Sequence, residues 1–198
     1  GVNISAEGMQ ISPAKLAAIQ AMPAPTNVSE LRGALGTLNF VRQFAPNFSI
    51  MAQPLYALLK AKAVWQWGPE QEQAFQSIKA KLAECIRLYH PAPDLPFRLY
   101  TDFSSRGIGA LLCQVDQNGV ERLCMAISRS CNVHERNYSS WDGEMLAVCW
   151  ACKTLRPYLL GRPVTVVTDH QPLTYLLHHT DLHGKQARWV MALADYDI

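Results

Sequence analysis

Three prolines within six residues, Pro91, Pro93 and Pro96, divide this chain of 198 residues into two parts with different patterning. Proline fixes its own φ and lacks a backbone N–H, so such a cluster favours a stiff linker. Before it, apolar residues recur at the spacing of helices. After it, short apolar and β-branched runs alternate with turn residues. We therefore expect a domain boundary at about residue 92.

The first part predicts a short hairpin followed by helices. Residues 2–5 and 9–11 flank a turn at Gly8, a residue that can adopt positive φ. Asn27 with Glu30 three positions later is a capping-box pattern. Three helices are expected: from Asn27 until Pro46, at about residues 49–60 with an interruption at Pro54, and from Pro69 onward.

The second part predicts an α/β domain. Strands are expected at residues 97–101, 108–114, 123–128 and 164–168, and a helix at residues 140–155 lies between the third and the fourth. Three consecutive strands, a helix, a fourth strand and further helical pattern describe a mixed sheet with flanking helices over residues 93–198.

Composition excludes some classes of protein. Apolar residues make up 49% and charged residues 17%, unlike a disordered chain. No apolar run approaches the roughly 20 residues of a membrane-spanning helix. The net charge of +2 divides into 8 Lys and Arg against 5 Asp and Glu in residues 1–92, and 10 against 11 in residues 93–198. Cys149 and Cys152 fall in an apolar helical stretch, which predicts buried, reduced thiols and an intracellular location, in cytoplasm or nucleus.

Three acids occupy positions typical of a metal site. Asp102 ends the first strand of the second part, Glu144 opens its long helix, and Asp169 ends its fourth strand. Carboxylates are suited to Mg²⁺ or Mn²⁺, and two such ions about 3.5–4 Å apart can support phosphoryl displacement. Each acid also has an ordinary structural explanation, because Asp forms turns and caps and Glu complements a helix dipole.

Eight segments resemble the Pol polyprotein of gypsy-type long-terminal-repeat retroelements. The segment 100–114 is similar to the T-D-A-S-x-x-G-I-G-A-V-L-x-Q signature that opens the ribonuclease H domain of that family. Five other segments resemble, in chain order, its E-x-N-Y, E-x-L-A-V, R-x-Y-L-x-G, T-D-H and R-W blocks: residues 135–138, 143–148, 156–161, 167–170 and 188–189. The last two segments, residues 30–40 and 67–75, resemble patterns of the family's thumb.

The resemblance implies a piece of reverse transcriptase. Residues 1–12 would be the end of a primer-grip-like hairpin, 13–92 a helical thumb, and 93–198 an RNase H-like domain truncated at its C-terminal end. The implied activity is hydrolysis of the RNA strand of RNA–DNA hybrids, with Asp102, Glu144 and Asp169 as catalytic ligands of two Mg²⁺ ions, which Mn²⁺ can replace. The implied partners are the hybrid and the upstream polymerase domains of the same polyprotein, with no membrane.

Several positions depart from the family pattern. A fourth acid is expected beyond Ile198, and the polymerase's paired aspartates upstream of Gly1. Phe103 replaces a small residue after the first acid, and Asp142-Gly143 precede Glu144. Three acids near the end of the chain do not match the motif that carries the fourth acid: Asp181, Asp195 and Asp197. We expect the loss of one carboxylate to weaken the binding of one metal ion and to lower the rate. Phe103 and Asp142-Gly143 should not disable the site.

Five thumb residues are candidates to follow a duplex: Arg32, Gly33, Gly36, Asn39 and Arg42. Glycines let a backbone approach a groove, and arginines reach phosphates. Helix–helix packing at the glycines and solvated arginines are the alternative. His170 is interpreted as a core residue or as one that supports the metal ligands, and His178 and His179 as surface residues.

Two other functions compete with the nuclease. One is a catalytically inactive, retroelement-derived structural or interaction subunit of a larger host assembly. The other is a nucleic-acid-binding module that acts through the thumb and predicts salt-sensitive duplex binding without cleavage.

Overall fold

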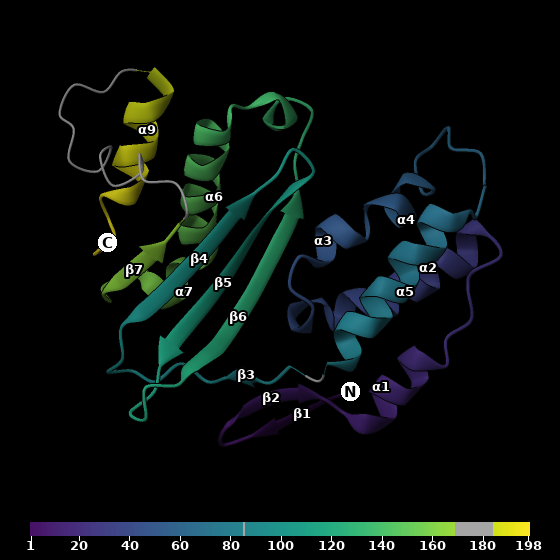
Figure 1. Ribbon diagram of the computed structural model, residues 1–198, viewed down its shortest axis with the longest axis horizontal. Coiled ribbons are helices and arrows are strands. Elements are labelled where there is room, and N and C mark those ends of the chain that lie inside the picture. Colours follow the sequence, from purple (N-terminus) through teal and green to yellow (C-terminus); the bar gives the residue numbers. More distant parts are fainter. Residues whose placement is uncertain (85, 169–183) are drawn as a thin grey trace.

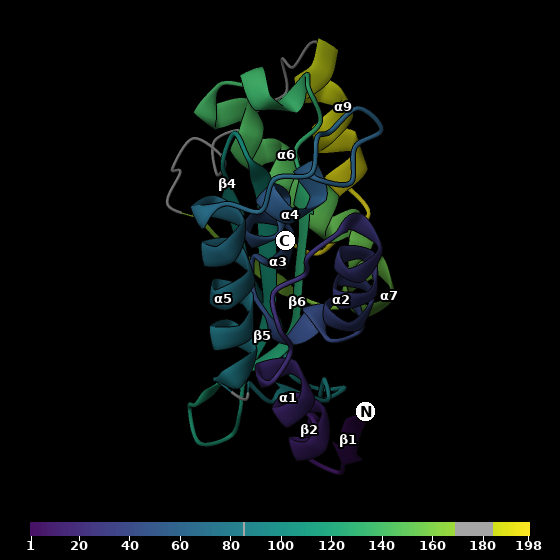
Figure 2. The same cartoon turned by 90° about the vertical axis from the view of Figure 1, so that its right-hand side faces the viewer.

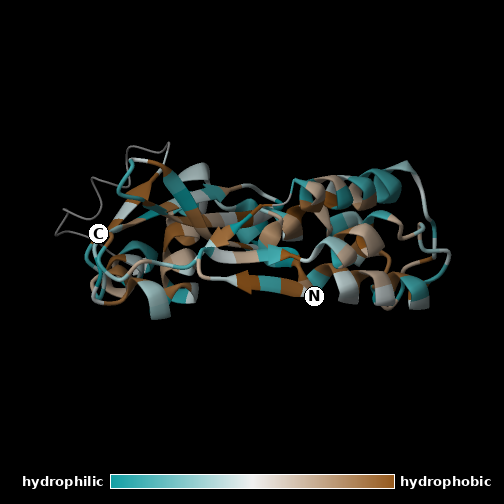
Figure 3. Cartoon of the chain, turned by 90° about the horizontal axis from the view of Figure 1, so that it is seen from below, coloured by the Kyte–Doolittle hydropathy of each residue, from teal (hydrophilic) through white to brown (hydrophobic). Residues whose placement is uncertain are grey.

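A computed structural model describes residues 1–84, 86–168 and 184–198 and shows an elongated molecule (Figures 1 and 3). Helices gather at one end and a β-sheet with its own helices lies at the other (Figure 1). We call residues 13–84 the helical region and residues 92–198 the sheet domain. The expected mixed α/β fold is confirmed.

The first half of the chain contains a small sheet and short to medium helices. Strands β1 (Val2–Ser5), β2 (Gly8–Ile11) and β3 (Leu88–Tyr89) form an antiparallel sheet in the order β1-β2-β3. The helices are α1 (Pro13–Gln20), α2 (Val28–Phe40), the 3₁₀ turn η1 (Arg42–Phe44), α3 (Phe48–Met51), α4 (Gln53–Ala57) and α5 (Pro69–Ala83).

Local capping explains where α2 begins. The Asn27 side chain accepts a hydrogen bond from Glu30 N at 2.9 Å, as the capping pattern predicts. The Glu30 carboxylate accepts from Thr26 N at 2.8 Å, one residue before the cap. The expected end near Pro46 is wrong: α2 ends at Phe40. A 3₁₀ turn then redirects the chain.

Helix α1 and strand β3 were not anticipated from the sequence. Helix α1 is capped by Ser12, whose hydroxyl accepts from Lys15 N at 3.3 Å. Strand β3 pairs with β2 at Gly8, where φ is +147° and an added Cβ would overlap the Leu88 carbonyl. This glycine therefore serves close backbone approach as well as the turn.

The sheet domain contains strands in the order β6-β5-β4-β7. Its elements are β4 (Phe97–Phe103), β5 (Gly107–Val115), β6 (Glu121–Ser130), the 3₁₀ turn η2 (Glu135–Asn137), α6 (Ser140–Thr154), α7 (Arg156–Leu159), β7 (Val164–Val167) and α9 (Gly184–Leu193). Strands β4, β5 and β6 are antiparallel neighbours, and β7 runs parallel to β4. The mixed sheet is thus confirmed, with β4, β5 and β6 slightly longer than expected and β7 one residue shorter.

Two main cores hold the molecule together. One lies within the helical region and includes the fully buried Phe44, Phe48 and Phe75. The second lies between the sheet and α6 and includes Phe97 and Leu99. Seen from the helical side, α2 and α5 lie in front of the sheet (Figure 2). The sheet therefore has α6 on one face and the helical region toward the other.

A polar contact joins the two regions. Ser49 N donates to Ser128 Oγ at 3.0 Å, and the Ser49 hydroxyl donates to the Ser128 carbonyl at 2.9 Å. Arg42 Nη2 donates to the same carbonyl at 2.7 Å. On the neighbouring strand an added Cβ at Gly107 would lie 2.7 Å from Ile50 Cγ1, and one at Gly109 would overlap the Asn47 amide oxygen. The two glycines of β5 make room for the helical region.

The cysteines described by the structure are free thiols. Burial raises the pKa of Cys149 and Cys152 to about 12, so both stay protonated at neutral pH. The prediction of a thiol pair without a disulfide is confirmed, although Cys149 is only partly buried. Within the described residues no helix is long and apolar enough to span a bilayer.

Candidate active site

Asp102 is the sixth residue of the seven-residue strand β4 and is exposed. It pairs with Gly109 across the antiparallel ladder, so both residues point to the same sheet face. A Cβ on Gly109 would meet Asn47 of the helical region. Asp102 therefore projects onto the face that the helical region approaches.

Strand β7 lies parallel to β4, with Tyr100 opposite Val167. Asp102 follows Tyr100 by two positions, and Asp169 follows Val167 by two positions in the sequence. Asp169 itself lies outside the described residues, as do His170, His178, His179 and Asp181. Parallel neighbours at the end of a sheet are the usual place for ligand-binding side chains.

Glu144 is the fifth residue of α6 and is only 6% exposed. Ser139 caps this helix, and its hydroxyl accepts from Asp142 N at 3.1 Å. At the next turn Gly143 lies against the Phe103 ring, and an added Cβ would be 2.5 Å from its Cγ. The neighbours of the two acids are therefore in direct contact.

This contact explains two departures from the family pattern together. A large side chain at position 103 fits because position 143 has no side chain. Phe103 also packs in the small cluster formed by Ile108, Cys131 and Ala147. The ring thus fills the space between the end of β4 and the first turns of α6.

The donor set suits a hard divalent ion, since carboxylate oxygens are the ligands that Mg²⁺ prefers. Asp102 is accessible and Glu144 is held in the domain core, on elements that touch. Among residues 1–84, 86–168 and 184–198, no three His, Cys, Asp or Glu side chains form a metal-binding group. The third predicted ligand, Asp169, is not in those ranges.

The duplex candidates of α2 and η1 fall into two sets. Arg32, Gly33 and Gly36 are exposed, and a Cβ added to either glycine would have nothing within 4 Å. The alternative of helix–helix packing at these glycines therefore finds no neighbour in the described chain. Asn39 instead donates to the Tyr56 hydroxyl at 2.8 Å. Arg42 bonds to Ser128 in the contact between regions.

Two further features were missed by sequence reasoning. Phe40 continues the surface of α2 and is 60% exposed. Lys60, Arg106 and Arg136 line one cleft between the two regions. They come from three separate segments, so no local pattern relates them. An aromatic residue at helical spacing from Gly33 and Gly36 was the signal available for Phe40.

Comparison with known proteins identifies the family. Residues 92–196 match the RNase H-like domain found in reverse transcriptase. The whole chain is 37% identical to part of the retrovirus-related Pol polyprotein from transposon opus of Drosophila melanogaster, spanning 21% of that protein. It is 34% identical to the corresponding protein from transposon gypsy of the same organism, where 96% of the chain spans 19% of the relative. The chain thus covers about a fifth of these relatives.

Solved structures share the fold. A foamy viral protease-reverse transcriptase in complex with dsDNA aligns over 98% of this chain and 41% of that chain, with a TM-score of 0.78 and 21% identity. The same type of protein in complex with an RNA/DNA hybrid aligns over 98% of this chain and 27% of that chain, with a TM-score of 0.75 and 23% identity. The chain therefore belongs to the retrovirus-related Pol polyproteins of gypsy-type and other long-terminal-repeat transposons, and residues 92–196 are its reverse-transcriptase RNase H-like domain.

Proposed function

We propose that this chain hydrolyses the RNA strand of RNA–DNA hybrids as the thumb and RNase H part of a reverse transcriptase. Residues 1–12 would end a primer-grip-like hairpin, 13–92 would be the thumb, and 93–198 the nuclease. The observation that carries the proposal is the contact between Phe103 and Gly143, which joins the element of Asp102 to the element of Glu144 inside the matched domain.

The acids have distinct tasks in this proposal. Asp102 is exposed, so a metal ion that it would hold could reach a substrate phosphate, whereas Glu144 is held in the core and would keep one ligand position fixed. Asp169 would complete the set. Mg²⁺ bound by these carboxylates supplies Lewis-acid activation of water and neutralises charge on the phosphodiester. A rigid Glu144 limits the reorganisation needed when the substrate binds.

The exposed face of α2 is proposed to follow the hybrid. Arg32 can reach a phosphate, and Gly33 and Gly36 leave the backbone open to a groove. Asn39 and Arg42 border this face while bonded to Tyr56 and Ser128. Hybrids would be distinguished from DNA by shape and by 2′-hydroxyl contacts.

The test is cleavage of a labelled RNA–DNA hybrid during titration with Mg²⁺ or Mn²⁺, with metal binding followed by calorimetry. We expect cleavage by the unchanged chain, and its loss in Asp102→Asn and Asp169→Asn. Asp94→Asn, an exposed acid of the same domain, is the matched control and should cleave normally. The same assay on a chain extended beyond Ile198 tests the contribution of a fourth carboxylate.

Absence of cleavage by the extended chain would overturn the proposed nuclease activity. The inactive structural or interaction subunit would then be the better description. Salt-sensitive duplex binding without cleavage would instead support the binding module.

A further inference from the structure

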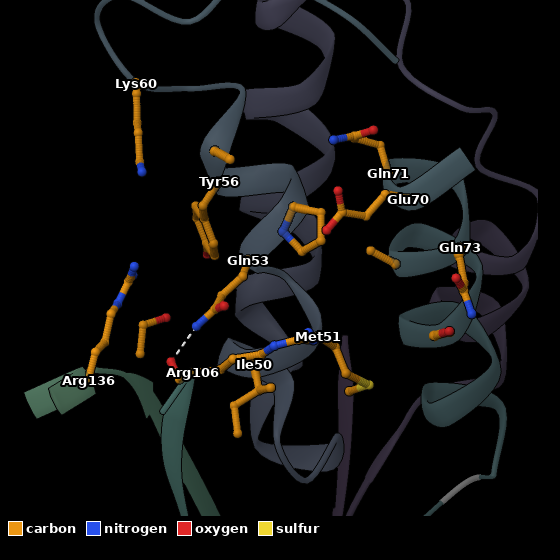
Figure 4. A pocket seen from close by; sticks show the side chains of 15 residues that line it. Ile50, Met51, Gln53, Tyr56, Lys60, Glu70, Gln71, Gln73, Arg106 and Arg136 are labelled. Atoms are coloured by element: carbon orange, nitrogen blue, oxygen red, sulfur yellow. Dashed lines mark hydrogen bonds between the residues drawn. The ribbon is translucent and has the colours of Figure 1, made fainter. Parts of the chain in front are cut away.

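A cleft of about 740 Å³ opens between the helical region and the sheet domain (Figure 4). One side is formed by α4, α5 and the chain after α4, and the other by the turn between β4 and β5 and by η2. Gln53 crosses it and donates to the Arg106 carbonyl. The cleft therefore depends on both regions being in place.

Three cationic side chains line this cleft: Lys60, Arg106 and Arg136. The charged ends of Lys60 and Arg136 approach the same space from opposite regions (Figure 4). Among the described residues none of the three forms an ion pair with a carboxylate. Glu70 is the one acid among the described residues that line the cleft. Cations that converge without matching acids favour a bound polyanion.

The character of the lining argues against a small apolar ligand. Most of the side chains around the cleft are polar or charged, whereas small-molecule sites are lined mainly by apolar and aromatic groups. The cleft is neither an enclosed cavity nor a flat surface. A charged polymer that passes along the surface fits these features better.

The cleft lies at the end of the sheet that carries the candidate active site. Arg106 is in the turn that directly follows β4, four positions after Asp102. Arg136 belongs to η2, which precedes the helix of Glu144. Asp102 projects onto the sheet face that the helical region approaches. A strand held at Asp102 would therefore pass close to these cations.

We propose that this cleft binds the phosphate backbone of an RNA–DNA hybrid, with Lys60, Arg106 and Arg136 each contacting a phosphate. The inference rests on the proposed function and assigns a second contact surface to the same substrate. Because the contacts come from both regions, the hybrid would bridge them and keep the thumb fixed relative to the nuclease.

The experiment is the salt dependence of hybrid binding, measured by fluorescence anisotropy with EDTA present so that no cleavage occurs. Each phosphate contact contributes about 0.9 to the slope of log K against log salt. The double variant Arg106→Gln/Arg136→Gln should lower the slope by about 1.8, and Lys60→Gln by about 0.9. Arg106→Lys/Arg136→Lys keeps the charge and should keep the slope.

The matched control is Lys15→Gln/Lys153→Gln, which removes the same charge outside the cleft. Equal slopes for the two double variants, with the unchanged chain binding normally, would overturn the proposed phosphate contacts of the cleft. The proposed hydrolysis of hybrids would not be affected by that result. Failure of the unchanged chain to bind any hybrid would overturn the proposed function together with this inference. Thermal unfolding of every variant checks that the fold is intact.

Discussion

The glycines of α2 and the glycines of the sheet domain differ in what surrounds them. Gly33 and Gly36 have nothing within 4 Å of an added Cβ, although a glycine inside a helix costs about 0.5–1 kcal/mol relative to alanine. Gly107, Gly109 and Gly143 instead have neighbours where a Cβ would be. The first pair leaves a surface open, and the second set makes internal contacts possible. Substitution should therefore have opposite effects on stability in the two regions.

The largest effect is expected at Gly143. In Gly143→Ala the new methyl group meets the Phe103 ring, and overpacking costs about 1–3 kcal/mol of unfolding free energy. We expect a value near the upper end, because ring carbons rather than the tip of a flexible chain are displaced. Urea unfolding measures the change, and hybrid cleavage should fall with it.

A double-mutant cycle sharpens this prediction. Phe103→Ala removes the ring, so Gly143→Ala should cost less in that background than in the unchanged chain. An equal loss of unfolding free energy in both backgrounds would show that the two residues do not constrain one another. The explanation that Gly143 makes room for the Phe103 ring would then be wrong.

Acid should remove a stabilising ion pair of the sheet domain. The Glu135 side chain is 11% exposed and accepts from both Arg129 Nη atoms at 2.7 and 2.9 Å, and this bonding holds the pKa of Glu135 below its usual value of 4.5. The stabilisation is therefore complete above pH 4.5 and is lost as pH falls through the lowered pKa. Glu135→Gln should cost about 2 kcal/mol at pH 7.

Urea unfolding at pH 7, 4.5 and 3 tests this. The difference in unfolding free energy between Glu135→Gln and the unchanged chain should shrink toward pH 3. Glu84→Gln, at an exposed ion pair with Lys81 in the helical region, should stay within about 0.5 kcal/mol at each pH. A Glu135 difference that is independent of pH would contradict the assigned ion pair.

A smaller loss is expected at Gly109. Gly109→Ala overlaps the exposed Asn47 amide, which can move, so we expect a cost of about 1 kcal/mol. Asn47 has φ of +60°, so Asn47→Gly keeps the backbone and removes the obstruction. The double variant should recover the stability measured by thermal unfolding. Failure to recover would place the strain elsewhere.

The smallest effect on stability, with opposite sign, is expected on α2. Gly33→Ala and Gly36→Ala should each raise the unfolding free energy by up to about 1 kcal/mol, because alanine favours the helix and meets no neighbour. Hybrid affinity should fall, because the added methyl groups stand on the proposed groove-facing surface. Ser29→Ala, exposed on the same helix, is the control and should leave affinity unchanged.

Local sequence signals determined much of the fold and part of the candidate site. Short apolar and β-branched runs between turn residues predicted β4, β5, β6 and β7, and the cap at Asn27 predicted the start of α2. Positions at a strand end and in the first turns of a helix drew attention to Asp102 and Glu144, and the family pattern added to this. These signals work because hydrogen bonding within one element and burial of one face depend on residues close in sequence.

Only the tertiary structure decided which surfaces meet. It showed that Phe103 is matched by Gly143, that Arg42 bonds to Ser128, and that three cations share one cleft. These relations join segments far apart in the chain, and no local periodicity encodes them. They depend on side-chain volume and on the relative placement of packed elements, which become defined only when the two cores form.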